Sequence, residues 1–272
     1  MSIPQERLLT ASRDNLISYM TALGAYVPGF ALAEDNGLIR IEAAMMYPMF
    51  NRVFTTPRDL KPDSLASLIE AEKSRYEKRG ASLMWVHWGE EEAPGLTERL
   101  VEGGFEEKNL LPGMGLDLTT PEEERPAIPG LAIETVTKAE TFEIYKDVSA
   151  RTFGLPLPLN TLLVDAIAGA ALQGDGKVVS YLAYLEGEPV AITTAFLEKG
   201  VAGIYNVGTL EAARGRGIGR AITQHAVREA RASGASLAVL QASKLGEPVY
   251  RGLGFEAGLT IGLYASPPPA AG

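Results

Sequence analysis

The segment between residues 214 and 220 is the part of the sequence best suited to hold an anion. It alternates arginine or isoleucine with glycine, so that a glycine occupies every second position. Glycine lets the backbone approach a ligand closely, and successive N–H groups can point toward one anion. The segment consists of Arg214, Gly215, Arg216, Gly217, Ile218, Gly219 and Arg220. Such a turn suits a phosphate.

The turn lies between an expected strand and an expected helix. Residues 202–207 have the composition of a strand, and the apolar spacing that starts at Ile218 predicts a helix ending near Gly234. The glycines therefore precede the first turn of a helix. Unpaired N–H groups and the helix dipole favour an anion there, and the arginines add full charges. A pyrophosphate would fit this description.

Spacing excludes two common phosphate motifs. The dinucleotide fingerprint G-x-G-x-x-G requires a third glycine where this chain has Arg220. The ATP-binding loop requires Ser or Thr after Gly-Lys, whereas the pair Gly176-Lys177 is followed by Val178. The segment does match R-x-x-G-x-G.

A second motif supports a family resemblance. Residues 250–255 read Tyr-Arg-Gly-Leu-Gly-Phe, which fits Y-x-x-x-G-F, and they follow a further expected strand at 237–241. With both motifs in this order, residues 131–265 resemble the GNAT superfamily of acyl-CoA-dependent N-acyltransferases. The resemblance implies acetyl-CoA as co-substrate, no metal, and direct transfer of the acetyl group to a primary amine on a small molecule or a protein.

The resemblance also implies roles for individual residues. The backbone of Val207, Gly208 and Thr209 is expected to bind the pantetheine arm and to polarise the thioester carbonyl. Tyr250 is expected to protonate the departing thiolate. Ser243 stands where many relatives have an asparagine that contacts pantetheine, and Thr209 and Glu211 replace the family's valine and proline.

No general base is identified. The expected strand at 202–207 has no acidic residue, although some relatives carry a glutamate there, so the amine is expected to lose its proton through water. His225 shares a helix face with Ile218 and Ile222 and is interpreted as a core residue. His87, between Trp85 and Trp88, is interpreted in the same way. The acidic residues Glu90, Glu91, Glu92, Glu98 and Glu102 are interpreted as a solvated face.

Composition excludes several classes of protein. The 272 residues include no cysteine and two histidines, which rules out an acyl-cysteine intermediate and makes a histidine-built zinc site implausible. A net charge of −9 argues against nucleic acid, and no apolar run is long enough to span a membrane. Because the first residues lack a signal-peptide pattern, we expect a soluble, cytoplasmic protein. The sequence allows a homodimer.

The pattern of the chain indicates two similar halves. Apolar periodicity predicts helices at 5–25, 62–80, 94–101, 139–153 and 160–172, and strands at 38–43, 49–55, 82–88, 114–118, 131–136, 177–185 and 188–197. Three marks recur in order in the two halves, which indicates a tandem repeat. They are Asn51, Gly80-Ala81-Ser82-Leu83 and Gly104-Phe105 in the first half, and Asn206, Gly234-Ala235-Ser236-Leu237 and Gly254-Phe255 in the second.

We therefore predict an α+β fold of two GNAT-like domains in tandem, each a three-layer arrangement around a mixed, mostly antiparallel sheet. The predicted limits are 1–120 for a degenerate first domain, 121–130 for a linker, 131–265 for the acetyltransferase domain and 266–272 for a disordered tail. The first half has Thr56 to Pro62 where the second has its glycine turn, and its two prolines remove N–H donors. That turn should not hold a pyrophosphate.

Two alternatives remain open. The protein could be an acyl-CoA sensor or scaffold without turnover, or an interaction protein in which residues 214–219 form an ordinary tight turn. Retained binding of CoA without transfer would favour the first alternative. Failure to bind any CoA species would favour the second.

Overall fold

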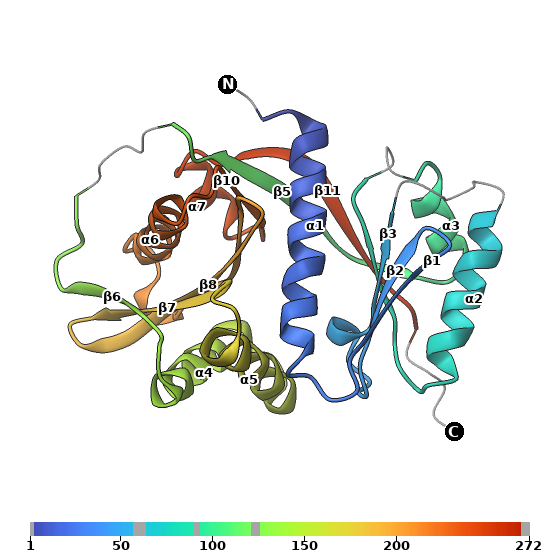
Figure 1. The fold of residues 1–272 in the computed structure, drawn as a ribbon, viewed down its shortest axis with the longest axis horizontal. Helices are drawn as coiled ribbons and strands as arrows, with labels where there is room; N and C mark the ends of the chain where they lie inside the picture. The colour runs from blue at the N-terminus through green and yellow to red at the C-terminus, as the bar shows by residue number, and fades with distance from the viewer. Residues whose placement is uncertain (1–2, 57–63, 90–92, 121–125, 268–272) are drawn as a thin grey trace. The chain divides into compact units, whose positions relative to one another are not determined.

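The computed structural model describes residues 3–56, 64–89, 93–120 and 126–267 (Figure 1). Parts of four sequence predictions lie outside the described residues. They are the glycine-free turn from residue 57 onward, the acidic run at 90–92, the linker at 121–125 and the tail from residue 268. Within the described ranges, no helix combines the length and the apolar character needed to cross a membrane.

The chain forms two compact units whose limits differ from the predicted halves. One, here called the site unit, contains residues 1–26 and 113–258. The other, the companion unit, contains residues 27–112 and 259–272. The first helix therefore belongs with the second half of the sequence, because it packs on that half's sheet. Each unit also takes a terminal strand from the other half of the sequence.

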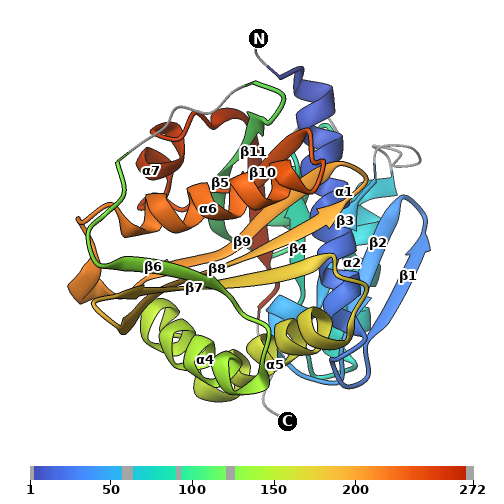
Figure 2. The same ribbon diagram turned by 60° about the vertical axis from the view of Figure 1, so that its left-hand side comes forward.

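The site unit is a three-layer α/β/α domain. Its strands follow the order β5-β10-β9-β8-β7-β6, and all neighbouring pairs are antiparallel except β9 and β10. Helix α6 covers one face, and α4 and α5 cover the other (Figure 2). The elements are α1 (Gln5–Gly24), β5 (Glu106–Asp117, of which residues 113–117 lie in this unit), β6 (Leu131–Thr135), α4 (Ala139–Phe153), α5 (Leu157–Gln173), β7 (Val178–Leu185), β8 (Glu188–Glu198), β9 (Val201–Thr209), η3 (Glu211–Ala213), α6 (Ile218–Ala232), β10 (Leu237–Gln241) and α7 (Glu247–Arg251).

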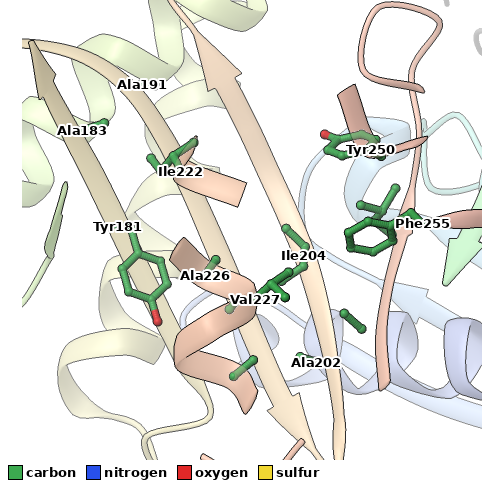
Figure 3. Packing of buried hydrophobic residues seen from close by; sticks show 14 of the residues in the cluster. Tyr181, Ala183, Ala191, Ala202, Ile204, Ile222, Ala226, Val227, Tyr250 and Phe255 are labelled. Atoms are coloured by element: carbon green, nitrogen blue, oxygen red, sulfur yellow. The ribbon is translucent and has the colours of Figure 1, made fainter. Parts of the chain in front are cut away.

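The two faces of this sheet are packed differently. Under α6 the contacts are apolar, because Ile218, Ile222 and Ala226 pack on alternate residues of the strands (Figure 3). On the other face the hydroxyl of Tyr145 from α4 lies 2.9 Å from that of Thr194, which lies 2.9 Å from that of Ser180. Helix α6 is thus held by apolar burial, whereas α4 is also tied to the sheet by buried hydrogen bonds.

The companion unit has a smaller mixed sheet, in the order β1-β2-β3-β4-β11. Only β3 and β4 run parallel. Helices α2 and α3 bury their apolar residues with Trp85 and Phe105. The elements are β1 (Ala31–Asp35), β2 (Leu38–Glu42), η1 (Pro48–Phe50), β3 (Arg52–Thr55), α2 (Leu65–Glu77), β4 (Met84–His87), α3 (Leu96–Glu102) and β11 (Glu256–Ala265), of which residues 259–265 lie in this unit.

The recurring sequence marks adopt the same local structure in both units. After α2, the N–H of Ala81 donates to the carbonyl of Tyr76 at 3.1 Å, and after α6 the N–H of Ala235 donates to that of Ala230 at 3.0 Å. Both are Schellman helix ends, with Gly80 and Gly234 at positive φ. The short helices α3 and α7 end in the same way, before Phe105 and Phe255. The Gly-Ala-Ser-Leu and Gly-Phe marks therefore identify equivalent helix ends.

The predicted fold class is confirmed. The predicted helices and strands are present, with some ends displaced. Strand β1 was not predicted because its five residues, all exposed, carry no apolar alternation. Helix α5 begins earlier than predicted, since Pro156 and Pro158 fit a first helical turn, and β5 is longer than the predicted strand.

Candidate functional site

Strand β9 leaves part of one edge without a strand partner. It pairs with β8 up to Thr209, but its parallel pairing with β10 covers only residues 201–203 of β9 and 237–239 of β10. Both strands continue beyond this point and separate. Among the described residues, no strand pairs with the β10-facing edge of β9 near Val207, Gly208 and Thr209. Backbone groups on such an edge can hydrogen-bond an extended ligand.

A β-bulge lies immediately before these three residues. Ile192 pairs with Gly208 and Thr194 pairs with Tyr205, so Thr193 alone faces Asn206 and Val207. Asn206 has a φ of +52°, a left-handed conformation that asparagine tolerates better than most residues. Bulges of this kind bend a strand and end regular pairing. The bulge explains why β9 changes direction where the free edge begins.

The glycine turn has a conformation that requires glycine. Gly215 and Gly217 have φ values of +75° and +80°, and Gly217 is the N-cap of α6. A Cβ on Gly219 would lie 3.2 Å from the Thr209 hydroxyl oxygen, so glycine lets the first turn of α6 approach the end of β9. The predicted phosphate turn and the predicted pantetheine strand are therefore adjacent.

The start of α6 offers backbone donors. Its first intrahelical bond runs from the N–H of Ala221 to the carbonyl of Gly217 at 3.0 Å. Within the described part of the chain, no group accepts a hydrogen bond from the N–H of Ile218, Gly219 or Arg220. Free N–H groups at a helix N-terminus are suited to an anion.

Exposed arginines surround these donors. The Nε of Arg214 donates to the carbonyl of Thr209 at 3.1 Å, which ties the turn to β9. Arg216 and Arg220 are exposed, and no ion pair of theirs occurs among the described residues. An Arg220 Nη2 atom lies 3.6 Å from the position of a Cβ on Gly217. Full positive charge thus lies over the turn, as the sequence predicted.

The last residues of α4 pack directly against the backbone of β9 at Gly208. A Cβ on Gly208 would lie 2.7 Å from the Thr152 Cγ2 atom and 3.0 Å from the Phe153 Cζ atom. Glycine is required there because the helix end approaches the strand backbone so closely. The sequence analysis did not identify this contact, since nothing in the local pattern indicates that α4 ends against Gly208.

Tyr250 lies in α7, with its ring edge-on to that of Phe255 at 6.0 Å (Figure 3). The side chain is buried in the core cluster under α6. Burial raises the pKa of Tyr250 to about 12, which keeps the phenol protonated at neutral pH. No hydrogen bond joins it to Val207, Gly208 or Thr209 among the described residues, although Tyr250 belongs to the core cluster on which Val207 packs.

Ser243 begins the turn that leads into α7. Its hydroxyl oxygen accepts a hydrogen bond from the N–H of Gly246 at 3.1 Å, and its carbonyl accepts from Gly246 and Glu247. The side chain therefore helps to cap the short helix that carries Tyr250. It is also exposed, so the hydroxyl proton stays available to a ligand.

His87 is buried as predicted, whereas His225, predicted as a core residue, is half-buried. His225 lies edge-on to the Tyr181 ring at a centroid distance of 5.0 Å, and burial lowers its pKa. His87 is 2% exposed in β4 of the companion unit.

Part of the sequence matches the model of a known protein family. Residues 145–255 match the model of the acetyltransferase (GNAT) family. No curated protein matches the sequence.

Solved structures share the fold. A GCN5-related N-acetyltransferase from Kribbella flavida has 21% identity and a TM-score of 0.72 over 94% of this chain and 95% of that one. The corresponding protein from Sphaerobacter thermophilus has 17% identity and a TM-score of 0.67 over 87% and 82%. A tandem GNAT protein from the clavulanic acid biosynthesis pathway has 12% identity and a TM-score of 0.58 over 96% and 97%. Residues 145–255 of this chain are therefore similar to the GNAT family of acetyltransferases, and the chain shares the fold of solved GNAT structures.

Proposed function

We propose that the site unit binds acetyl-CoA between β9 and the start of α6 and transfers its acetyl group to a primary amine. The pyrophosphate takes the N–H groups of residues 217–220 and the charge of Arg216 and Arg220. The pantetheine arm runs along the free edge of β9. The adjacency of that edge and the glycine turn, with Gly219 against Thr209, is the observation that carries the proposal.

The reaction proceeds by direct transfer with both substrates bound. The amine nitrogen attacks the thioester carbonyl carbon, the C–S bond breaks, and the thiolate takes a proton from Tyr250. Backbone N–H groups of residues 207–209 stabilise the charge that develops on the carbonyl oxygen. The amine loses its proton through water, since β9 contains no acidic residue. Holding the two substrates together supplies much of the rate.

The acceptor is a small-molecule or protein amine. The net charge of −9 favours neither nucleic acid nor an anionic membrane surface as a partner. A cytoplasmic location and a homodimer stay predictions. The companion unit serves a structural or substrate-shaping role in this proposal.

Thermal unfolding with and without saturating acetyl-CoA tests the proposal. Ligand at 100 times its Kd stabilises the native state by about 2.7 kcal/mol. For a unit of this size, we expect the midpoint to rise by about 5–10 °C. Gly217→Glu should abolish the rise, because it places a side chain and a negative charge in the turn.

Gly176→Glu is the matched control. Gly176 also has positive φ, with open space around it, but it precedes β7 at the opposite end of the sheet from Thr209. It should destabilise the protein and retain the acetyl-CoA-dependent rise. No rise in the wild type would leave the interaction-protein alternative. A rise without acetyl transfer to any amine in a broad panel would favour the sensor or scaffold.

A further inference from the structure

Helix α1, from the beginning of the sequence, contacts the irregular part of β9. The Nδ2 of Asn206 donates to the Tyr19 hydroxyl oxygen at 3.0 Å. Asn206 is the residue in the β-bulge with positive φ, and Tyr19 is 5% exposed. A side chain from α1 thus holds the one left-handed residue of β9.

A second set of contacts fixes Tyr19 itself. Its ring stacks on that of Tyr205, with centroids 4.3 Å apart and planes within 2°. The Tyr205 hydroxyl donates to the Oδ1 of Asn15 at 2.8 Å. The Nδ2 of Asn15 in turn reaches the carbonyls of Phe196 and Val201 at 3.4 and 3.3 Å. Asn15 and Tyr19 are four residues apart and share one face of α1, so the helix holds β9 at two points.

The bulge determines where the next backbone groups point. Val207, Gly208 and Thr209 follow Asn206 directly, and in the proposed function their N–H groups meet the thioester carbonyl. A left-handed φ at a residue with a side chain costs free energy and persists only when its surroundings enforce it. The bond to Tyr19 supplies that enforcement.

We propose that Tyr19 and Asn206 are positioning residues for acyl transfer: α1 fixes the bulge and so aims the backbone of residues 207–209 at the thioester carbonyl. The inference rests on the proposed function. It assigns to the first helix a part in the site that the motifs of the second half do not predict.

Infrared spectroscopy of bound [1-¹³C]acetyl-CoA tests this without knowledge of the acceptor. Hydrogen bonds from residues 207–209 lower the carbonyl stretching frequency in the wild type relative to free acetyl-CoA. Tyr19→Phe keeps the ring stack and removes the hydroxyl, so the frequency should move back toward the free value. The affinity for inorganic pyrophosphate should be unchanged, because in the proposed function it binds at residues 214–220 and does not contact the edge of β9.

Two further variants keep the test decisive. Tyr76→Phe removes an equally buried phenol hydroxyl, in the companion unit, and should leave the frequency at the wild-type value. Asn206→Gly accepts positive φ without strain but lacks the amide, so it should shift the frequency as Tyr19→Phe does even where the latter folds poorly. Combining the two substitutions should add nothing.

The outcomes separate the two proposals. Wild-type protein that binds acetyl-CoA, with a frequency that Tyr19→Phe and Asn206→Gly leave unchanged, overturns the positioning role alone. Wild-type protein that binds no acetyl-CoA in calorimetry overturns the proposed function and the positioning role together. A frequency shift in both variants and none in Tyr76→Phe supports the role.

Discussion

The two units contain the same strand-helix-strand crossover. In the site unit an antiparallel pair, β8 and β9, is followed by α6 and the parallel strand β10. In the companion unit β2 and β3 are followed by α2 and the parallel strand β4. The helices end in the same Schellman geometry, before Ala235 and Ala81. The backbone plan is therefore shared, and the differences lie in what each crossover leaves free.

The strands differ first. Strand β3 pairs with β2 without a shift in register, whereas β9 contains the bulge. The two asparagines at equivalent sequence positions, Asn206 and Asn51, also differ in conformation and hydrogen bonding. Asn206 holds positive φ within β9, but Asn51 precedes β3 and bonds the backbone of Ala43, Met45 and Tyr47. At the end of α3, Leu100 occupies the position that Tyr250 occupies at the end of α7, since its carbonyl accepts the N–H of Phe105 as that of Tyr250 accepts the N–H of Phe255. The companion crossover thus lacks both the bulge and the phenol.

Charged side chains of the companion crossover pair with one another, although Arg52 Nε and Thr55 Oγ1 of β3 are buried without a hydrogen-bond partner among the described residues. Arg40 of β2 forms two hydrogen bonds with Glu72 of α2, at 2.7 and 2.6 Å, and both side chains are almost fully buried. Glu42 accepts hydrogen bonds from Arg75 of the same helix and from Arg79, which lies just after the helix end. The site unit places its arginines around an open helix N-terminus instead. One crossover therefore keeps free backbone donors and exposed arginines, as the proposed function requires, whereas the other pairs its arginines with its own glutamates.

Separating the halves at the predicted boundary should have the largest effect. A fragment of residues 131–272 lacks α1 and the segment 113–117, which pairs with β10. We expect it to be unfolded by circular dichroism and to bind no acetyl-CoA in calorimetry. A chain joining residues 1–26 to 113–258 through a flexible glycine-serine linker should fold and bind. A folded, binding fragment would instead support the boundary predicted from the sequence.

Tyr250→Phe should remove the proposed acid. We expect kcat to fall by about 100- to 10,000-fold, with the KM for acetyl-CoA unchanged, in a thiol-release assay. Tyr181→Phe, a change in the same core cluster, should leave kcat near the wild-type value.

The pH dependence of kcat checks the same assignment. The acid acts in its protonated form, and its pKa is raised to about 12, so activity that depends on it is lost only as pH rises through that value. A descending limb between pH 8 and 10 that disappears in Tyr250→Phe would contradict this ionisation.

Glu72→Gln should affect the companion unit without affecting acetyl-CoA binding. Removing the buried partner leaves Arg40 paired only with the exposed Asp35, at 2.7 Å, so we expect a loss at or below that of a broken buried ion pair, about 3–5 kcal/mol. Both tryptophans, Trp85 and Trp88, lie in this unit, so their fluorescence during urea unfolding reports on it directly. Glu70→Gln, on the exposed side of α2, should change the free energy of unfolding by less than about 0.5 kcal/mol. A weakened affinity for acetyl-CoA in Glu72→Gln would show that the units are not separable in this way.

Gly80→Ala and Gly234→Ala should have small and equal effects. Both glycines have positive φ at equivalent helix ends, and a Cβ would meet no atom within 4 Å at either position. Only the left-handed conformation is penalised, by about 1–2 kcal/mol. Scanning calorimetry of the two variants measures the loss. Clearly unequal losses would show that the two helix ends are not equivalent.

The sequence was most informative where function requires unusual residues. The glycine turn, the strand before it and the helix after it were predicted correctly because positive φ and free N–H groups demand glycine. The Gly-Ala-Ser-Leu repeat was informative for the same reason. The sequence could not show which sheet α1 covers, because an amphipathic helix records only that one face is buried.

The sequence also could not predict which strands pair or where the β-bulge lies. Strand β11 was not among the predicted strands, and a strand's alternation does not identify its neighbour in the sheet. Asn206 could have been suspected, since asparagine is common at positive φ and this one precedes Val-Gly. Its partner Tyr19 lies far away in the sequence, and only the fold brings the two together.

The exchange of terminal strands has a consequence for the order of folding during synthesis. Residues 259–265 complete the sheet whose other strands, β1 to β4, are translated first, and the whole of segment 113–258 emerges in between. The edge of β4 that pairs with β11 therefore lacks its partner strand while residues 113–258 are synthesised. Domains that fold as they emerge avoid such exposure, and unpaired edges favour aggregation. This chain should accordingly depend on chaperones until its last strand has been added.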